Sequence, residues 1–454
     1  MKKIDLSQLR YFSMRHALKM LGGFFTEGWY AKGDPMSTDR ARLLACNYTS
    51  NVIANMIGGT FWTGFLLLLN ADDAFVGTIT MIITAANMLQ FIAPLFLEQF
   101  KKRKVMLTIL RGIIYLLNVV LIGVIPLFPV GSQFKLTMVA VSVLLVNVIN
   151  ALIAPGLSIW HVQSLPNNVR QSFFSVVTMT VGAVVVLFNL IGSKVVDMLT
   201  ARGMEYLGFS VLRIFAVILC AVELILYFKI KEYPYESSAE RFTIKDLFTV
   251  PFKNRKYLYT VAVVFLWCFA ANLPGSYYTV YLLRDLEVSY SYITVISMFN
   301  IPIVLLLTPF WKKLLTKFGW FKTLYISMAV YLTHYVLLAL VTKGTLFIYP
   351  ISQILAYVFA IGINLSFTGI PYVNMPEKNQ TVFIGFYSSV SNLAALLGVT
   401  LGKYFILFTE EMKLDIFCFM FGNKQALVLL TGLMLVGATI GIAVINKKTS
   451  KDTE

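Results

Sequence analysis

The residues best placed to do chemistry are asparagines that recur at helical spacing within long apolar stretches. Asn51, Asn55, Gly58 and Trp62 lie three or four residues apart and so share one stripe of a helix. A carboxamide both donates and accepts hydrogen bonds, which matches a hydroxyl group, and aromatic rings offer a platform for a sugar ring. The predicted contacts of a neutral, polyhydroxylated solute are Asn51, Asn55, Trp62, Asn87, Asn147, Asn150, Asn272, Tyr278, Asn300, Asn364 and Asn392.

A second interpretation competes at each of these positions. Asparagine inside an apolar helix also links helices to one another, at roughly 1 kcal/mol per hydrogen bond. The roughly equivalent placement of Asn55 and Asn272, and of Asn150 and Asn364, favours a shared cavity for the set as a whole.

Ionisable side chains are scarce within the same stretches. Glu223, His334 and Arg111 are the main exceptions, and the predicted cavity holds no buried counter-charge. Because an uncompensated ion in low dielectric costs several kcal/mol, a strongly charged substrate is disfavoured. Glu223 and His334 are the candidates for proton coupling, and the sequence leaves H+ and Na+ open as coupling ions.

Catalytic and cofactor motifs are not found in the sequence. The histidines, at positions 16, 161 and 334, have no metal-ligand spacing, and no Ser/His/Asp set or phosphate-binding Gly loop appears. We therefore expect no cofactor, no metal and no enzymatic activity.

Long apolar segments must position these residues. Hydrophobic residues make up 58% of the 454 and mean hydropathy is +0.76. A helix needs about 20 apolar residues to cross the hydrocarbon of a bilayer. Twelve segments meet that length, which predicts an all-α polytopic membrane protein: 45–69, 74–97, 105–127, 135–160, 171–193, 208–230, 257–282, 290–312, 322–342, 346–371, 381–408 and 426–446.

Charge predicts topology and partners. The net charge of +16 gathers in alternate loops, as the positive-inside rule requires when both termini are cytoplasmic. We therefore expect a multi-pass monomer in the cell membrane, with lipid and a small-molecule substrate as partners and no nucleic acid.

The segments repeat as two halves. Asn55-x-x-Gly58 recurs as Asn272-x-x-Gly275, and Gly192 as Gly402. A basic turn follows the second segment of each half, with Glu98, Lys101, Lys102 and Arg103 in one copy and Lys317, Gly319 and Lys322 in the other. The predicted organisation is a cytoplasmic N-terminal segment with an interfacial helix (1–43), a six-helix bundle (44–230), a cytoplasmic linker (231–256), a second bundle (257–446) and a cytoplasmic tail (447–454).

Two six-helix halves, a long linker and a repeated basic turn resemble the major facilitator superfamily over residues 44–446. The resemblance implies two pseudo-symmetric bundles that alternate access to a central site. It implies that the basic turns act as gates, with an acid such as Glu98 capping a neighbouring helix. It also places the segments that carry Arg111, Glu223 and His334 at the periphery.

Transport of a small neutral polar solute, with a sugar or glycoside favoured, is the predicted function. An exporter of amphipathic, drug-like compounds is the alternative within transport. A sensor that binds on the same fold without net flux is the alternative outside it.

Overall fold

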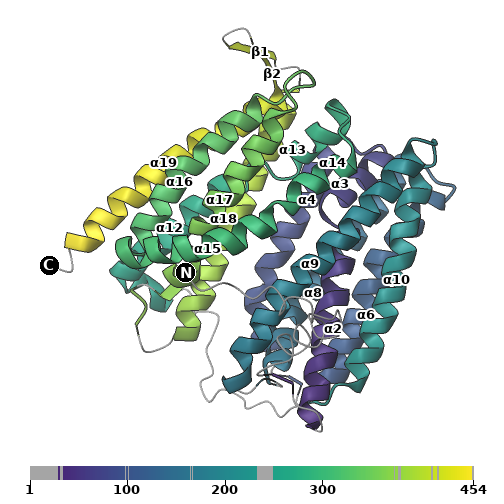
Figure 1. Ribbon diagram of the computed structural model, residues 1–454, viewed down its shortest axis with the longest axis horizontal. Coiled ribbons are helices and arrows are strands. Elements are labelled where there is room, and N and C mark those ends of the chain that lie inside the picture. The colour runs from purple at the N-terminus through teal and green to yellow at the C-terminus, as the bar shows by residue number, and fades with distance from the viewer. Residues whose placement is uncertain are drawn as a thin grey trace, which may run out of the picture.

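The computed structural model is almost wholly helical (Figure 1). It describes residues 29–30, 34–97, 99–100, 102–163, 165, 167–232, 249–372, 374–376, 380–410, 413–416 and 419–451. The expected interfacial helix near the N-terminus, at residues 6–25, and most of the linker lie outside these residues.

The first half of the chain forms one bundle, coloured purple to teal in Figure 1. Its elements are α2 (Pro35–Met56), α3 (Gly59–Leu68), α4 (Asp73–Met88), η2 (Leu89–Ile92), α5 (Ala93–Leu97), α6 (Lys104–Tyr115), the π-turn η3 (Leu116–Leu121), α7 (Ile122–Val124), η4 (Ile125–Leu127), α8 (Ser132–Gln163), α9 (Asn167–Thr200) and α10 (Glu205–Lys229).

The second half forms the green and yellow bundle beside it. Its elements are α12 (Arg255–Ala271), α13 (Tyr277–Val280), the π-turn η5 (Tyr281–Asp285), α14 (Tyr290–Met298), α15 (Asn300–Phe318), α16 (Trp320–Ala339), α17 (Ile348–Gly369), η6 (Ile370–Tyr372), α18 (Gln380–Phe408), β1 (Lys413–Ile416), β2 (Phe419–Gly422) and α19 (Asn423–Lys451).

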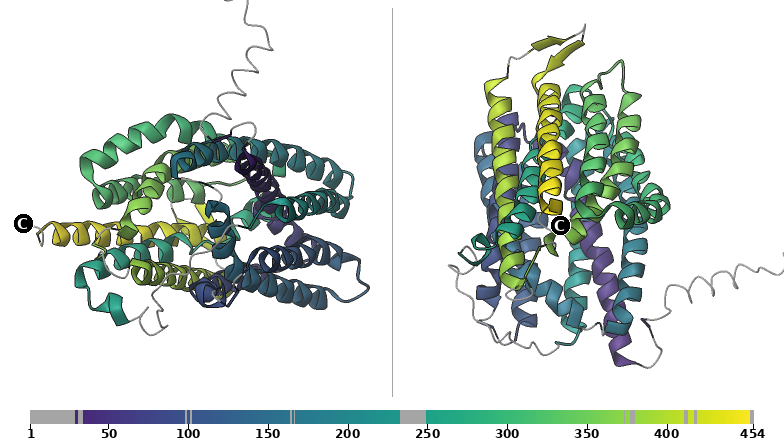
Figure 2. Two further views of the ribbon diagram at one scale, coloured as in Figure 1. Left: turned by 90° about the horizontal axis from the view of Figure 1, so that it is seen from below. Right: turned by 90° about the vertical axis from the view of Figure 1, so that its left-hand side faces the viewer.

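The two ends of the molecule are distinct. An antiparallel hairpin of β1 and β2 projects beyond the helices at one end, which we call the hairpin end (Figures 1 and 2). At the other, the linker end, α2 begins, α10 ends and α12 begins. The halves meet through two related helix pairs, α4 with α18 and α9 with α14.

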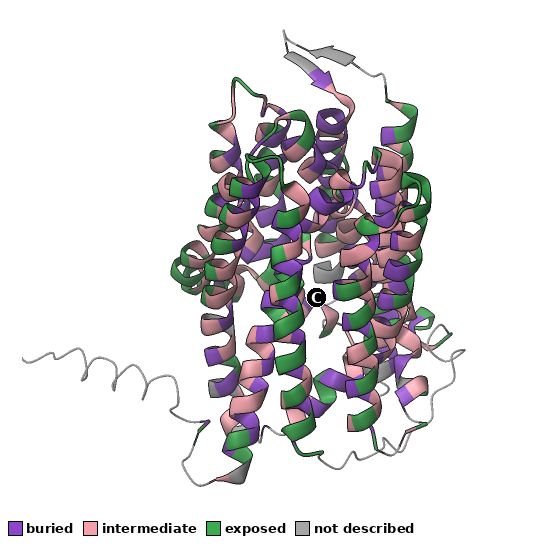
Figure 3. Ribbon diagram, turned by 90° about the vertical axis from the view of Figure 1, so that its right-hand side faces the viewer, coloured by how far each residue is buried: buried purple, intermediate pink, exposed green. Residues whose placement is uncertain are grey.

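Ten of the described helices are long and apolar enough to cross a membrane. The remaining two predicted segments are helical as well, at α12–α13 and at α16. Many large apolar side chains stay exposed along the helices, including Leu116 at 58%, Leu306 at 77% and Leu433 at 68% (Figure 3). Such extensive apolar exposure fits contact with lipid and not with water.

The first helix of each half departs from a continuous span. The first helix begins at Pro35, earlier than the predicted residue 45, because Asp34 accepts a hydrogen bond from the Met36 N–H and caps it. It breaks at Ile57 and Gly58, and the seventh breaks at residues 272–276. Gly59 and Gly275 take positive φ values of 53° and 50° at these breaks, a conformation that glycine adopts without strain. The predicted Asn-x-x-Gly repeat therefore ends at a helix break in each half.

Close backbone packing joins α12 to α18 within the second half. A Cβ on Gly398 would overlap the carbonyl oxygen of Phe269, and one on Gly402 would overlap that of Leu273. Small residues at such spacing let two membrane helices approach closely, where dispersion and not hydrophobic burial holds them together.

Replacing Gly402 by Val should therefore lower the free energy of unfolding by about 1–3 kcal/mol through overpacking. The measurement is thermal unfolding of the purified protein in detergent. Gly437→Val is the matched control, because no atom lies within 4 Å of a Cβ added at that site. Equal losses of stability in the two variants would contradict the packing argument.

Candidate substrate pocket and gates

A pocket of about 330 Å³ lies inside the first half, beside the break between α2 and α3. Gly58, Gly59 and Trp62 form one wall, α8 forms another through Asn147 and Asn150, and α6 with η3 closes the back. The structure thus brings three of the predicted contacts, Trp62, Asn147 and Asn150, into one pocket. Its other polar lining residues are Ser50, Arg111, Tyr115 and Asn118.

Arg111 in this lining corrects the expectation of a cavity without a charged group. Its Nε lies 3.4 Å from Oε1 of Glu223 on α10, and its Nη2 lies 3.1 Å from Oγ of Ser50. The long side chain reaches the pocket from α6, which the family resemblance placed at the periphery. Sequence spacing could not reveal the pair, because its partners lie 112 residues apart.

Glu223 compensates this charge from behind the pocket. Its side chain is fully buried, whereas that of Arg111 is 16% exposed. Thr49 donates a hydrogen bond of 3.1 Å to Oε2 of the same carboxylate. The pair therefore presents hydrogen-bond donors to the pocket while contributing no net charge.

Several asparagines satisfy one amide N–H within their own helix. The Nδ2 atoms of Asn51, Asn55, Asn147 and Asn272 each donate to the carbonyl oxygen four residues earlier, at 2.7 to 2.9 Å. Asn55 also meets another helix, because its Oδ1 accepts a 3.4 Å hydrogen bond from Asn189. The intrahelical bonds leave the second amide proton of each side chain available to other partners.

The remaining predicted contacts do not line this pocket. Asn51, Asn55, Asn300 and Asn364 are exposed, and Asn87, Asn272 and Asn392 are half-buried. Tyr278 packs on the core of the second half, where its ring stacks on Tyr349 and its hydroxyl lies 3.4 Å from the Leu338 carbonyl.

His334 lies in the interface of α16 and α17. Its side chain is 6% exposed, and its Nδ1 lies 2.8 Å from Oγ and 2.9 Å from the carbonyl oxygen of Ser352. This geometry is that of a packed histidine, whereas Glu223 contacts a residue of the pocket wall.

Charged residues join the halves at the hairpin end. Asp73 of α4 pairs with Arg284 of η5 and lies 3.1 Å from Nζ of Lys424 on α19. Lys424 also lies 2.9 Å from Asp285 and is 7% exposed. This charge cluster, Asp73, Arg284, Asp285 and Lys424, ties the first half to two elements of the second.

A second contact joins the halves at the same end. The carboxylate of Asp197, near the end of α9, accepts hydrogen bonds from the backbone N–H groups of Tyr290 (2.9 Å) and Ser291 (2.8 Å) at the start of α14. The Tyr290 hydroxyl lies over Gly64, where any Cβ would overlap it. An acid at a helix N-terminus accepts hydrogen bonds from free N–H groups and interacts favourably with the positive end of the helix dipole. Because Asp197 and α14 belong to different halves, this contact holds the hairpin end closed.

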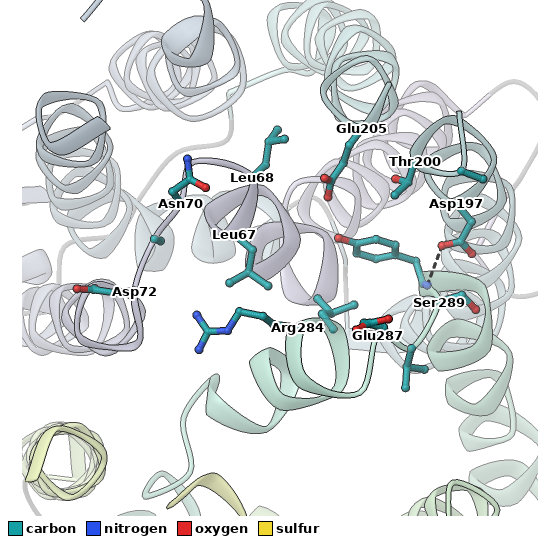
Figure 4. Close-up of a pocket in the computed structure, with 15 residues that line it drawn as sticks. Leu67, Leu68, Asn70, Asp72, Asp197, Thr200, Glu205, Arg284, Glu287 and Ser289 are labelled. Atoms are coloured by element: carbon teal, nitrogen blue, oxygen red, sulfur yellow. Dashed lines mark hydrogen bonds between the residues drawn. The ribbon is translucent and has the colours of Figure 1, made fainter. Parts of the chain in front are cut away.

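A cleft of about 820 Å³ lies beside this closure (Figure 4). Glu205 points into it from α10 and Arg284 from the second half, with Asp197 at its edge. Its charged lining residues are mostly acidic, and none of the predicted contacts belongs to it.

The basic turn of the first half is tied to the linker. Glu98 and Lys101 lie outside the described residues, and Lys102 is exposed. The backbone N–H groups of Arg103 and Lys104, where α6 begins, both donate to Oε1 of Glu232. The acid seen capping this helix is therefore a linker residue 129 positions away, which no local pattern in the sequence indicates.

The second basic turn is exposed. Gly319 has a φ of 76° between α15 and α16, and the Nζ atoms of Lys317 and Lys322 lie 5.3 and 5.0 Å from the Phe318 ring centroid. Both amines pack locally on one aromatic ring.

Comparison with known proteins agrees with this architecture. The sequence model described as Major Facilitator Superfamily matches residues 38–399. The chain belongs to the major facilitator superfamily. It is thus a transporter of that superfamily, whose halves correspond to the two bundles. No curated protein sequence matches the chain.

Solved structures of this superfamily share the fold at low identity. A mutant form of the nucleoside transporter NupG is 12% identical, with a TM-score of 0.66 over 90% of this chain and 99% of that one. A bacterial homologue of the human lysosomal transporter Spinster, inward-facing and unoccupied, is 15% identical, with a TM-score of 0.64 over 93% and 99%. A bacterial homologue of the iron transporter ferroportin, also inward-facing, is 11% identical, with a TM-score of 0.63 over 88% and 98%.

Neutralising Lys424 should open the hairpin end. Asp73 and Asp285 share two cations, Arg284 and Lys424. Lys424→Gln removes the more buried of the two, so the closed population should fall several-fold. Spin labels at Gly131 and Gly344, in hairpin-end loops of the two halves, report the separation by pulsed electron spin resonance. Lys343→Gln is the control, because its pair with Glu287 is exposed and lies within one half. Unchanged distances in Lys424→Gln would show that the charge cluster does not hold the gate.

Proposed function

We propose that this transporter moves a small neutral polar solute by alternating access, with a sugar or glycoside favoured. The observation that carries the proposal is the pocket at the break of α2 and α3. Its lining combines the amides of Asn147 and Asn150 with the indole of Trp62, and its cation, Arg111, is paired with Glu223. Amides, and a guanidinium whose charge is balanced by a carboxylate, can form hydrogen bonds with hydroxyl groups of an uncharged solute.

The pocket's size supports a small solute. About 330 Å³ is near the lower end for ligand sites, which span roughly 300–1,000 Å³. A nucleoside is the second candidate, because Trp62 stacks with Phe65 in this region and could receive a base. NupG, which shares the fold, is a nucleoside transporter.

The two halves supply the motion. Discontinuous helices at corresponding positions of repeated halves are typical of transporter binding sites. The remaining asparagines, Asn51, Asn55, Asn87, Asn272, Asn300, Asn364 and Asn392, would complete the site from both halves. We further propose that the protein lies in the cell membrane with its linker end cytoplasmic and its hairpin end external. We also propose that it works as a monomer of two domains, predicted at 44–230 and 257–446, whose first and last helices extend to Pro35 and Lys451.

Counterflow in proteoliposomes tests the function. Vesicles are loaded with one unlabelled solute, which is glucose, lactose, uridine or alanine, and are offered the same solute in labelled form. Labelled solute should accumulate in vesicles loaded with a sugar or with uridine and not in those loaded with alanine. Asn150→Leu should reduce that flux at least about tenfold, because an apolar group then faces the solute's hydroxyls. Ser158→Ala on the same helix, outside the pocket lining, should retain it.

Two outcomes would contradict the proposal. Flux of lipophilic cations alone would favour an exporter of amphipathic compounds. Stabilisation of the protein by a sugar without any counterflow would favour a sensor.

We propose Glu223 as the proton-coupling residue, because it contacts the pocket wall through Arg111 and His334 does not. Glu223→Gln should abolish uptake driven by a pH gradient while leaving counterflow, since exchange needs no net proton movement. His334→Gln should retain both activities. Loss of gradient-driven uptake in His334→Gln alone, or uptake driven only by a sodium gradient, would contradict this assignment.

A further inference from the structure

Arg213 is a buried cation that the proposed mechanism does not use. It lies on α10 within the first half and is 7% exposed, and no acidic partner is found among the described residues. Its Nη1 donates to the carbonyl oxygens of Asn118 (2.9 Å) and Val119 (3.3 Å). Its guanidinium carbon lies 4.2 Å from the centroid of the Phe65 ring. Burying a cation without an acidic partner costs more free energy than burying an apolar residue, so Arg213 is a candidate for a specific role.

The two carbonyl groups belong to the π-turn η3. The Ile122 N–H bonds to the Leu117 carbonyl, five residues earlier, instead of to Asn118. The wider turn therefore frees the Asn118 carbonyl from its usual helical donor, and Arg213 replaces that donor. Tyr206, also on α10, donates to the Gly123 carbonyl at 3.2 Å just beyond the turn.

The π-turn lies in the pocket wall. Tyr115, directly before it, and Asn118, within it, both line the pocket. One residue of helix corresponds to about 100° of rotation, so relaxation of the turn to regular α-helix would carry Asn118 out of the wall. π-turns inside α-helices are frequent at functional sites.

We propose that Arg213 is a positioning residue that holds the π-turn open and thereby keeps the Asn118 amide in the substrate pocket. Arg213 does not touch the solute. It sets specificity through Asn118, whose amide supplies one hydrogen-bond pair to a solute hydroxyl. This role rests on the proposed function only in taking that pocket as the substrate site.

Thiol labelling tests the positioning without any substrate. In a background with Cys46, Cys220, Cys268 and Cys418 replaced by Ala, Asn118→Cys reacts with 2-aminoethyl methanethiosulfonate in the purified protein. Adding Arg213→Leu should slow this reaction at least about fivefold. The control Ala54→Cys, which lines the same pocket from α2, should keep its rate within about twofold. Arg213→Lys, which retains charge and donors, should restore most of the rate at position 118.

An unchanged rate at position 118, or an equal loss at positions 118 and 54, would overturn the proposal. The second result would mean a general collapse of the pocket. If Arg213→Leu does not fold, Arg213→Gln replaces it in the comparison of labelling rates at positions 118 and 54. The shorter glutamine side chain cannot reach the carbonyl groups of both Asn118 and Val119, so the same slower rate at position 118 is expected.

Transport provides an independent readout. For whichever of glucose, lactose or uridine shows counterflow, Arg213→Leu should raise KM roughly tenfold and change kcat less than about threefold. In an Asn118→Ala background the same substitution should have little further effect. Full additivity of the two substitutions would overturn the link through Asn118. If no solute is transported, the proposed function fails while the labelling result still decides the role of Arg213.

Discussion

A polar group that enters the hydrocarbon must find its partner inside the protein, and this requirement organises the first half of the molecule. Glu223, fully buried, bonds with Thr49 and Arg111. Arg213 donates to the Asn118 carbonyl, which a π-turn frees from its usual helical donor, and to the Val119 carbonyl beside it. Each partner comes from another helix, so satisfying these groups also fixes how α2, α6 and α10 face one another. The pocket is the space that this arrangement leaves.

The same requirement explains where helices can break. Irregular backbone is tolerated at membrane depth only where it is buried or lines a cavity. The break at Gly58 and Gly59 lines the pocket. The break at residues 272–276 lies against the other half, where Ser276 and Thr80 are 3.4 Å apart. Breaks at related positions thus place two irregular pieces of backbone beside a cavity and beside the interface of the halves.

Contacts within a half and between halves differ in kind. Within the second half, α12 and α18 approach until glycine is the residue that fits, which makes this bundle a rigid unit. Between the halves, the hairpin end is joined by ion pairs and by the Asp197 cap on α14. Water can replace such polar contacts when the end opens, whereas it cannot replace close apolar packing. The physical division between rigid bundles and a reversible interface suits alternating access.

Hydropathy alone predicted twelve membrane segments and their approximate ends, because crossing a bilayer imposes a length and composition on each segment separately. Ten of the described helices are long and apolar enough to be such segments. The repeated Asn-x-x-Gly pattern likewise predicted paired features in the two halves. Tertiary structure decided which side chains meet. Arg111 and Glu223 are 112 residues apart, and Glu232 caps α6 from 129 positions away. The asparagine stripe predicted a polar surface but not which of its members share a pocket, because that depends on how far helices from different parts of the chain rotate and separate. The sequence could therefore identify a transporter, while the charge pair and the π-turn in its pocket wall required the packed bundle.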